Sequence, residues 1–237
     1  MRLTVIGKYG PYPRKGCSTT SYLLEVEEQR FLLDCGAGTA SYLEADVTRL
    51  TAIFLSHLHA DHVSDLLLLN QMLGVINPAI RIPVYVQRIP GPVYQYLSTM
   101  DVLFLQPIDI GEAYAFGDVK VEFCPMVHPL PSVAMAVEGE GKRFVYTGDT
   151  QYHKGLLHFA MDADGILMDT AFPQNMLPEN PPHMSAREGA KLAKACGAKL
   201  ALFSHIHPQA DEDAMRQEAE AIFPTAQIVE EGAHYFI

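Results

Sequence analysis

The feature that most constrains this chain is a short apolar strand that runs directly into a cluster of metal-binding side chains. Residues 51–55 are apolar at strand length, and the apolar run at 63–73 that follows has the length of a helix. Between these two segments lie three histidines and one aspartate: His57, His59, Asp61 and His62. The ligands are therefore expected on a strand-to-helix loop, whose backbone can direct the first pair to one point and the second pair to another.

This cluster predicts a site for two metal ions a few ångström apart. Neutral imidazole and carboxylate suit Zn²⁺, and Mn²⁺ or Fe accept the same ligands, whereas Ca²⁺ prefers oxygen ligands throughout. The alternative is a solvated polar loop with chance histidines, and the density of ligand side chains argues against it.

The motif His-x-His-x-Asp-His after a buried strand resembles the signature of the metallo-β-lactamase fold superfamily of binuclear metallohydrolases. In that superfamily a further His follows, then an Asp after a Gly at a strand end, then a last His at another strand end. This chain offers all three in the same order, as Val127-His128-Pro129, Gly148-Asp149 and Ser204-His205. The resemblance covers essentially the whole chain and implies an α/β (α+β) fold, a four-layer αββα sandwich of two mixed sheets with helices outside.

The resemblance also assigns the metal ligands. It places His57, His59 and His128 on one ion and Asp61, His62 and His205 on the other. It also places Asp149 between the two ions. A water bridging two such ions should be hydroxide near neutral pH, because one bound Zn²⁺ already lowers the pKa of water to about 7. His207 is a second candidate for the last ligand, and His205 is favoured because it follows directly on a predicted strand.

Length and charge limit the class of protein. The 237 residues suit one larger α/β domain, predicted to span 1–237. With 17 Lys and Arg against 28 Asp and Glu, an extended nucleic-acid surface is not expected. No apolar run approaches the roughly 18 residues of a membrane span, and no signal-peptide pattern opens the chain, so a cytoplasmic protein away from membranes is predicted. The four cysteines lack CxxC spacing and are expected to be reduced thiols.

Turn and capping signals predict the remaining elements. Hairpins are expected at 22–34 and 133–146, and further strand at 114–118 and 119–124. A strand at 82–87 is followed by a short helix at 93–100 and a loop to 107. Ser185 and Glu188 form a capping-box pattern that should open a helix ending at Gly197.

Two segments near the start have open alternatives. The loop at 7–16 carries Lys8, Arg14 and Lys15, and it either only connects strands or contacts an anionic substrate. Asp34 precedes Cys35-Gly36. In the resembled superfamily such a carboxylate lies beneath the metals and orients a ligand histidine, whereas the simpler role is to cap the helix that follows.

His183-Met184-Ser185 resembles the His-Ser-Thr loop of the ribonuclease Z branch, whose members process tRNA 3′ ends. There a histidine supported by an acidic residue serves as general acid to the leaving alkoxide. Asp169 occupies the supporting position here, where the branch more often has Glu, one methylene longer. The alternative is that His183 is an exposed loop residue.

Two departures separate the chain from a tRNA nuclease. The ribonuclease Z branch carries a long basic arm between the third histidine and the bridging aspartate, whereas only a tight hairpin separates His128 from Asp149 here. The acidic composition agrees. We therefore predict a small member lacking the arm: a zinc-binding, binuclear hydrolase, a phosphodiesterase on a small or cyclic phosphodiester or a short nucleotide, with Asp61, His183 and Asp169 as catalytic residues.

Three rival functions remain open. A lactonase or thioesterase would use the same metals without His183, a tRNA nuclease would need a basic arm from a partner or a second subunit, and a metal-free binding module would need no ligand set. The sequence does not give the physiological substrate, the native metal or the oligomeric state, and it is compatible with a homodimer.

Overall fold

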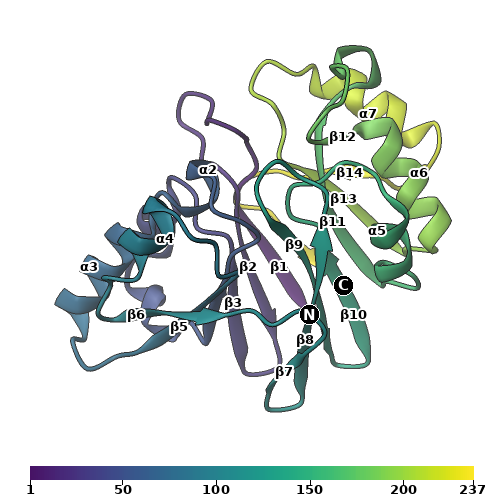
Figure 1. The fold of residues 1–237 in the computed structure, drawn as a ribbon. Helices are drawn as coiled ribbons and strands as arrows, with labels where there is room; N and C mark the ends of the chain where they lie inside the picture. The colour runs from purple at the N-terminus through teal and green to yellow at the C-terminus, as the bar shows by residue number, and fades with distance from the viewer.

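Two mixed sheets face each other in the computed structural model, which describes residues 1–237 apart from the side chain of Ala45 (Figure 1). The first sheet has the order β15-β1-β2-β3-β4-β5-β6 and the second β14-β13-β11-β10-β9-β8-β7, with β12 paired to β11. The strands of the first sheet are β1 (Arg2–Gly7), β2 (Ser21–Val26), β3 (Gln29–Leu33), β4 (Ala52–Phe54), β5 (Ile82–Val86), β6 (Leu103–Pro107) and β15 (His234–Phe236). Those of the second are β7 (Ala113–Phe116), β8 (Val119–Met126), β9 (Ser132–Gly139), β10 (Lys142–Tyr146), β11 (Gly165–Phe172), β12 (Met184–Ser185), β13 (Leu200–Ser204) and β14 (Gln227–Ile228).

Helices cover the outer face of each sheet (Figure 1). The first sheet carries α1 (Thr39–Leu43), the 3₁₀ helix η1 (Glu44–Arg49), α2 (Ala60–Val63), α3 (Leu66–Ile76) and α4 (Pro92–Leu97). The second carries α5 (Lys154–Phe159), η2 (Gln174–Met176), α6 (Ala186–Cys196) and α7 (Glu212–Glu220). The result is the predicted αββα sandwich.

Three clusters of buried apolar residues hold the four layers together. One lies between the two sheets, and each of the others lies between a sheet and its helices, so the central strands are buried on both faces. Phe54 of β4 belongs to the cluster between the sheets, where its ring packs against Phe31 and Phe123 with centroids 5.3 and 5.8 Å apart. Its neighbour Ile53 points the other way, into the cluster beneath the helices of the first sheet. Successive side chains of a strand point to opposite faces, so one strand serves two layers.

The two sheets share one layout. In the first, β1, β2 and β3 pair antiparallel and β3 to β6 run parallel. In the second, β7 to β10 pair antiparallel and β10, β11, β13 and β14 run parallel. The carboxyl ends of the parallel strands in each sheet therefore meet at one edge, and these two edges enclose the site described below.

Most predicted elements form, including both predicted hairpins and the capping box of α6, in which Ser185 accepts from the Glu188 amide and Gly197 ends the helix at φ 73°. The strand predicted at 114–124 forms as β7 and β8, which pair antiparallel. Residues 103–107 were expected in a loop, and this prediction was wrong. They form β6, an edge strand parallel to β5, whose entry is fixed by the Asn70 side-chain oxygen accepting from the amides of Val102 and Leu103. The run at 63–73 belongs to two helices, since α2 ends at Val63 and α3 begins at Leu66. No helix within the described residues is long and apolar enough to cross a membrane.

Candidate metal centre

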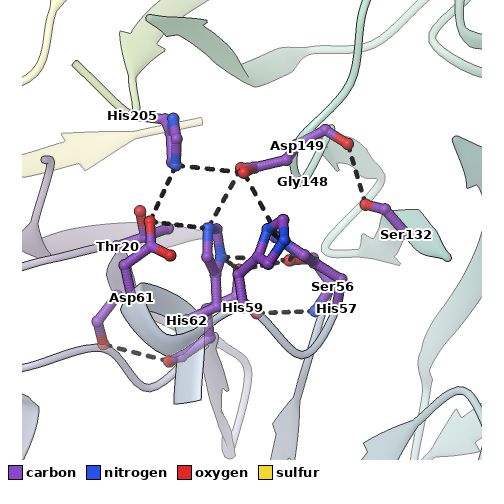
Figure 2. Close-up of polar contacts among 12 residues, drawn as sticks. Thr20, Ser56, His57, His59, Asp61, His62, Ser132, Gly148, Asp149 and His205 are labelled. Atoms are coloured by element: carbon purple, nitrogen blue, oxygen red, sulfur yellow. Dashed lines mark hydrogen bonds and ion pairs between the residues drawn. The ribbon is translucent and has the colours of Figure 1, made fainter. Parts of the chain in front are cut away.

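The first ligands come from the loop after β4 and from the helix α2 that follows it (Figure 2). His57 follows the buried strand, and His59 is the N-cap residue of α2. Asp61 and His62 lie in the first turn of that helix, where consecutive side chains diverge. His57, Asp61 and His62 are buried, so the cluster is not the solvated loop of the alternative interpretation.

The second group of ligands comes from strand ends of the other sheet. His128 follows β8, Asp149 follows β10 and His205 follows β13. His57 Nε2 lies 2.8 Å from His59 Nδ1, which in turn lies 3.2 Å from His128 Nε2. Asp149 Oδ2 lies 3.6 Å from His57 Nε2, and the four ligand atoms of this set lie within 4.8 Å of one another.

A second ligand set lies beside the first. Asp61 Oδ2 is 3.2 Å from His205 Nε2 and 3.5 Å from His62 Nε2. Asp149 is 3.3 Å from each of these two histidine nitrogens, through Oδ1 to His62 and Oδ2 to His205. Figure 2 shows Asp149 between the two sets, facing His57, His62 and His205. The structure thus brings together all seven predicted ligands in the predicted grouping.

These residues fit divalent metal ions. Ring nitrogens that face one another at 2.8 and 3.2 Å match the spacing of about 3.3 Å between ligand atoms of a tetrahedral zinc with bonds of about 2.05 Å. His62 Nε2 and Asp149 Oδ1 are buried atoms without a hydrogen-bond partner, and a cation would satisfy both.

Burial sets the charge of the first set. Desolvation lowers the pKa of the His57 imidazole well below its usual range, and burial also lowers the pKa of His59 and His128. These rings are therefore neutral near pH 7 and offer lone pairs to a cation.

Asp34 lies directly behind the ligands. His62 Nδ1 donates to Asp34 Oδ2 at 2.8 Å, and the carboxylate also accepts from the Ser56 amide and hydroxyl at 2.7 and 2.8 Å. Tyr146 of the opposite sheet donates to the same Oδ2 at 2.5 Å. With Nδ1 of His62 held as the donor, Nε2 faces the metal centre, so Asp34 orients a ligand.

Capping α1, the other role considered for Asp34, falls to Asp65. Its Oδ2 accepts from the amides of Gly38 and Ala40 at 3.0 and 2.9 Å.

His183 lies beside the second ligand set and is paired with Asp169. His183 Nδ1 is 2.7 Å from Asp169 Oδ2, so the shorter Asp side chain reaches the histidine. The His183 ring stacks on His205 with centroids 4.8 Å apart, and only 14% of its side chain is exposed. The alternative of an exposed loop residue is therefore wrong. Asp169 Oδ1 also lies 3.4 Å from His205 Nδ1, so one carboxylate contacts both histidines.

His207, the other candidate for the last ligand, lies outside the ligand set. Its ring stacks on Phe172 with centroids 4.9 Å apart. His205 supplies the ligand atom instead, and it does so from a left-handed backbone conformation with φ 55°, as Asp34 does with φ 57°.

Two of the three basic side chains of the 7–16 loop, Lys8 and Arg14, are paired with carboxylates. Lys8 Nζ lies 2.9 Å from both Glu212 and Glu230, and Arg14 donates to Glu212 at 2.8 Å. The interpretation of these two cations as contacts to an anionic substrate therefore fails. The loop forms a wall instead, because a Cβ on Gly10 would lie 2.0 Å from His205 Nε2.

Sequence reasoning missed several supporting residues. The Asp34 carboxylate accepts from the hydroxyls of Ser56 and Tyr146. The Asp169 carboxylate accepts from the backbone amide of Thr150 at 3.0 Å. Nothing in their local sequence marks them, since each partner is distant in the chain.

Comparison with known proteins decides the family. The profile of the β-lactamase superfamily domain matches residues 29–206. The chain belongs to this superfamily. Together with the ligand set, membership makes it a divalent-metal-dependent hydrolase.

Individual relatives agree with this assignment. The probable metallo-hydrolase YhfI of Bacillus subtilis is 28% identical over 236 residues, which cover 94% of each chain. The crystal structure of B. subtilis YhfI matches with a TM-score of 0.91 at 26% identity over 99% of this chain and 98% of that one.

More distant proteins also match this chain. A ribonuclease Z from Methanopyrus kandleri is 23% identical over 264 residues, covering 96% of this chain and 94% of the relative. A diphosphatase from the PhnP family has a TM-score of 0.76 at 15% identity, covering 100% and 97%. The ribonuclease Z-like resemblance predicted from the sequence is confirmed.

Proposed function

We propose that this hydrolase cleaves small phosphodiesters, including cyclic phosphodiesters and short nucleotides, with two Zn²⁺ ions and with His183 as general acid. The observation that carries the proposal is the pairing of His183 Nδ1 with Asp169 Oδ2 at 2.7 Å, beside the ligand set. The proposal assigns the seven ligand atoms described above to the two ions.

His183 is placed to serve a leaving group. It lines a cavity of about 380 Å³ together with Asp61, Asp149 and other ligand residues. Because its Nδ1 is engaged by Asp169, Nε2 is the nitrogen that can give a proton to a substrate. Hydrolysis of an ester of a poor leaving alcohol needs such a proton, whereas a good leaving group departs without it.

The reaction proceeds by displacement at phosphorus. Bound divalent ions would lower the pKa of a water molecule and offset the negative charge on the phosphoryl oxygens. The oxygen of water bonds to phosphorus, the bond from phosphorus to the leaving oxygen breaks, and its electron pair stays on that oxygen. His183 Nε2 gives the leaving oxygen a proton. Of the two protons lost by the water, one restores His183 and the other goes to solvent.

The shape and charge of the site support a small substrate. Between His128 and Asp149, where the resemblance places the arm of the nuclease branch, this chain has only the hairpin of β9 and β10, with Glu140 and Gly141 at its turn. Within the described residues, the cavity is lined by neither Lys nor Arg. The net charge of −11 also opposes a long polyanion. Relatives named ribonuclease Z and diphosphatase support phosphoester chemistry.

The test compares two diesters in wild type and His183→Ala, with metal content measured on each preparation. For trifluoroethyl methyl phosphate, whose leaving alkoxide needs a proton, we expect kcat to fall about 10²-fold or more. For bis(p-nitrophenyl) phosphate, whose leaving phenolate needs none, the fall should be much smaller. Asp61→Ala should abolish both activities, and the exposed His158→Ala is the matched control that should change neither.

Equal losses on the two diesters in His183→Ala would remove the general acid from the proposal. Wild-type protein with two metal equivalents but no phosphodiester turnover would reject the substrate class and move the assignment to lactones or thioesters, which use the same ligand set.

A further inference from the structure

A second cavity lies beside the one that contains the ligands. It has a volume of about 210 Å³ and shares Pro11, Pro182, His183 and His205 with the larger cavity. Its remaining lining includes Phe172 and His207. Because four residues line both spaces, a substrate bound at the ligand set can extend one of its groups into this smaller cavity, here named the ring recess.

Stacked side chains form one wall of the ring recess. Phe172 and His207 stack with an interplanar angle of 27°, and Tyr12 packs edge-on against His207 with centroids 5.8 Å apart. The His207 amide donates to the Ala171 carbonyl at 3.0 Å, which fixes this loop to the end of β11. The wall is therefore held before any substrate binds.

The lining of the ring recess selects against charge. Within the described part of the chain, the residues that line it include no Lys, Arg, Asp or Glu, and prolines and rings predominate. Placing a phosphate there would remove its hydration without a compensating cation. A flat, uncharged ring would instead bury apolar surface and stack on the aromatic wall.

The position of His183 indicates which group of the phosphodiester substrate enters the ring recess. His183 lines both cavities, and in the proposed function it gives its proton to the leaving oxygen. The group attached to that oxygen therefore lies on the His183 side. We propose that the ring recess binds the leaving alcohol and selects substrates in which that alcohol carries a flat, uncharged ring. This inference rests on the proposed function.

Substitution of the ring wall tests the proposal. The substrates are p-nitrophenyl methyl phosphate, with a ring on the leaving oxygen, and trifluoroethyl methyl phosphate, with none. In Phe172→Ala, kcat/KM for p-nitrophenyl methyl phosphate should fall on the order of 10-fold, because losing one aromatic contact costs about 1.4 kcal/mol. The kcat/KM for trifluoroethyl methyl phosphate should change less than about 2-fold. Phe104→Ala, a partly exposed aromatic on the β6 edge strand, is the control expected to change neither.

Two further variants guard against a folding artefact. His207→Ala removes the other ring of the wall and should show the same selective loss. Phe172→Trp enlarges the wall into the recess and should also lower turnover of the ring substrate while sparing trifluoroethyl methyl phosphate. Equal loss on both substrates, or no loss in all three variants, would overturn the proposal.

A binding measurement separates failure of the ring recess from failure of the proposed function. Calorimetry on metal-loaded protein would compare benzylphosphonate with methylphosphonate. If wild type cleaves neither diester yet binds benzylphosphonate about 10-fold more tightly, and Phe172→Ala removes that difference, the recess stands and the phosphodiesterase assignment fails. Equal affinities in wild type would overturn the recess itself.

Discussion

The two halves of the molecule place acidic residues at matching positions and use them differently. Asp34 follows β3, the last antiparallel strand of its sheet, and Asp149 follows β10, the last antiparallel strand of the other. Asp34 lies behind the ligands and holds His62, whereas Asp149 lies between the two ligand sets. The same strand end therefore provides support in one half and a ligand in the other.

The halves also differ in how they gather ligands. The first half supplies His57, His59, Asp61 and His62 from one short segment, the loop after β4 and the helix α2 that follows it, whereas the second supplies one ligand from each of three strand ends. The first group depends mainly on local geometry, while the second exists only when the whole second sheet has formed. Four predictions test this contrast.

The largest effect is expected at Asp149. Asp149→Asn removes the charge that faces both ligand sets, so we expect kcat to fall by about 10³-fold or more and metal content to drop. Elemental analysis and phosphodiester turnover check this. If the variant retained the metal content of wild type, Asp149 would not be a metal ligand, and its role would be limited to support, like that of Asp34.

Metal removal should lower the stability of the fold, because the metal ligands come from both halves of the molecule. Ligands from both sheets meet at one site, so metal ions bind the folded state and not the unfolded one. At a free metal concentration 1,000 times Kd, chelation should lower the free energy of unfolding by about 4 kcal/mol, seen as a fall in Tm. Asp149→Asn should show a smaller shift on chelation, and an identical shift would contradict the assigned ligand role.

Asp34→Asn should have a weaker effect than its counterpart. The amide no longer accepts from His62 with a full charge, and second-layer changes of this kind lower metal affinity by about 10 to 100-fold. Competition with a chelator measures this. Asp164→Asn, at a carboxylate paired with Lys199 away from the site, should leave affinity unchanged.

Loss of a helix cap should give the smallest effect of the four, a change in the free energy of unfolding. It again compares a group whose partner is near in the chain with one whose partner is distant. Ser185→Ala removes the local cap of α6 and should cost about 1 kcal/mol of unfolding free energy. Asp65→Ala removes a distant cap that serves two amides of α1 and should cost at least as much. Urea denaturation of both variants decides, and a negligible cost for Asp65→Ala would show that α1 needs no cap.

The features predicted from sequence were those whose signal lies within a few residues. The His57 to His62 motif, the capping box at Ser185 and the two predicted hairpins all belong to this class. His128, Asp149 and His205 were predicted through their order in a resembled family, since no local pattern marks them.

Features that depend on contacts between distant segments were missed. Tyr146 reaches Asp34 across the two sheets, 112 residues away in the chain. The pairing of Lys8 with Glu212 and Glu230 joins segments more than 200 residues apart, so the sequence did not show that this cation is neutralised. The edge strand β6 was missed because only one of its faces is covered and its pattern is short.

The left-handed backbone at Asp34 and His205 implies a local trade-off between stability and activity. A side chain other than glycine in this conformation costs on the order of 1 kcal/mol or more, which the rest of the fold must offset. Glycine would relieve that cost at either position but would delete a group that the site needs. At Asp34 it would also leave the buried donors of Ser56, Tyr146 and His62 without their acceptor. The strained conformation is therefore retained for the side chain that it carries, at His205 for the metal centre and at Asp34 for the hydrogen bonds behind that centre.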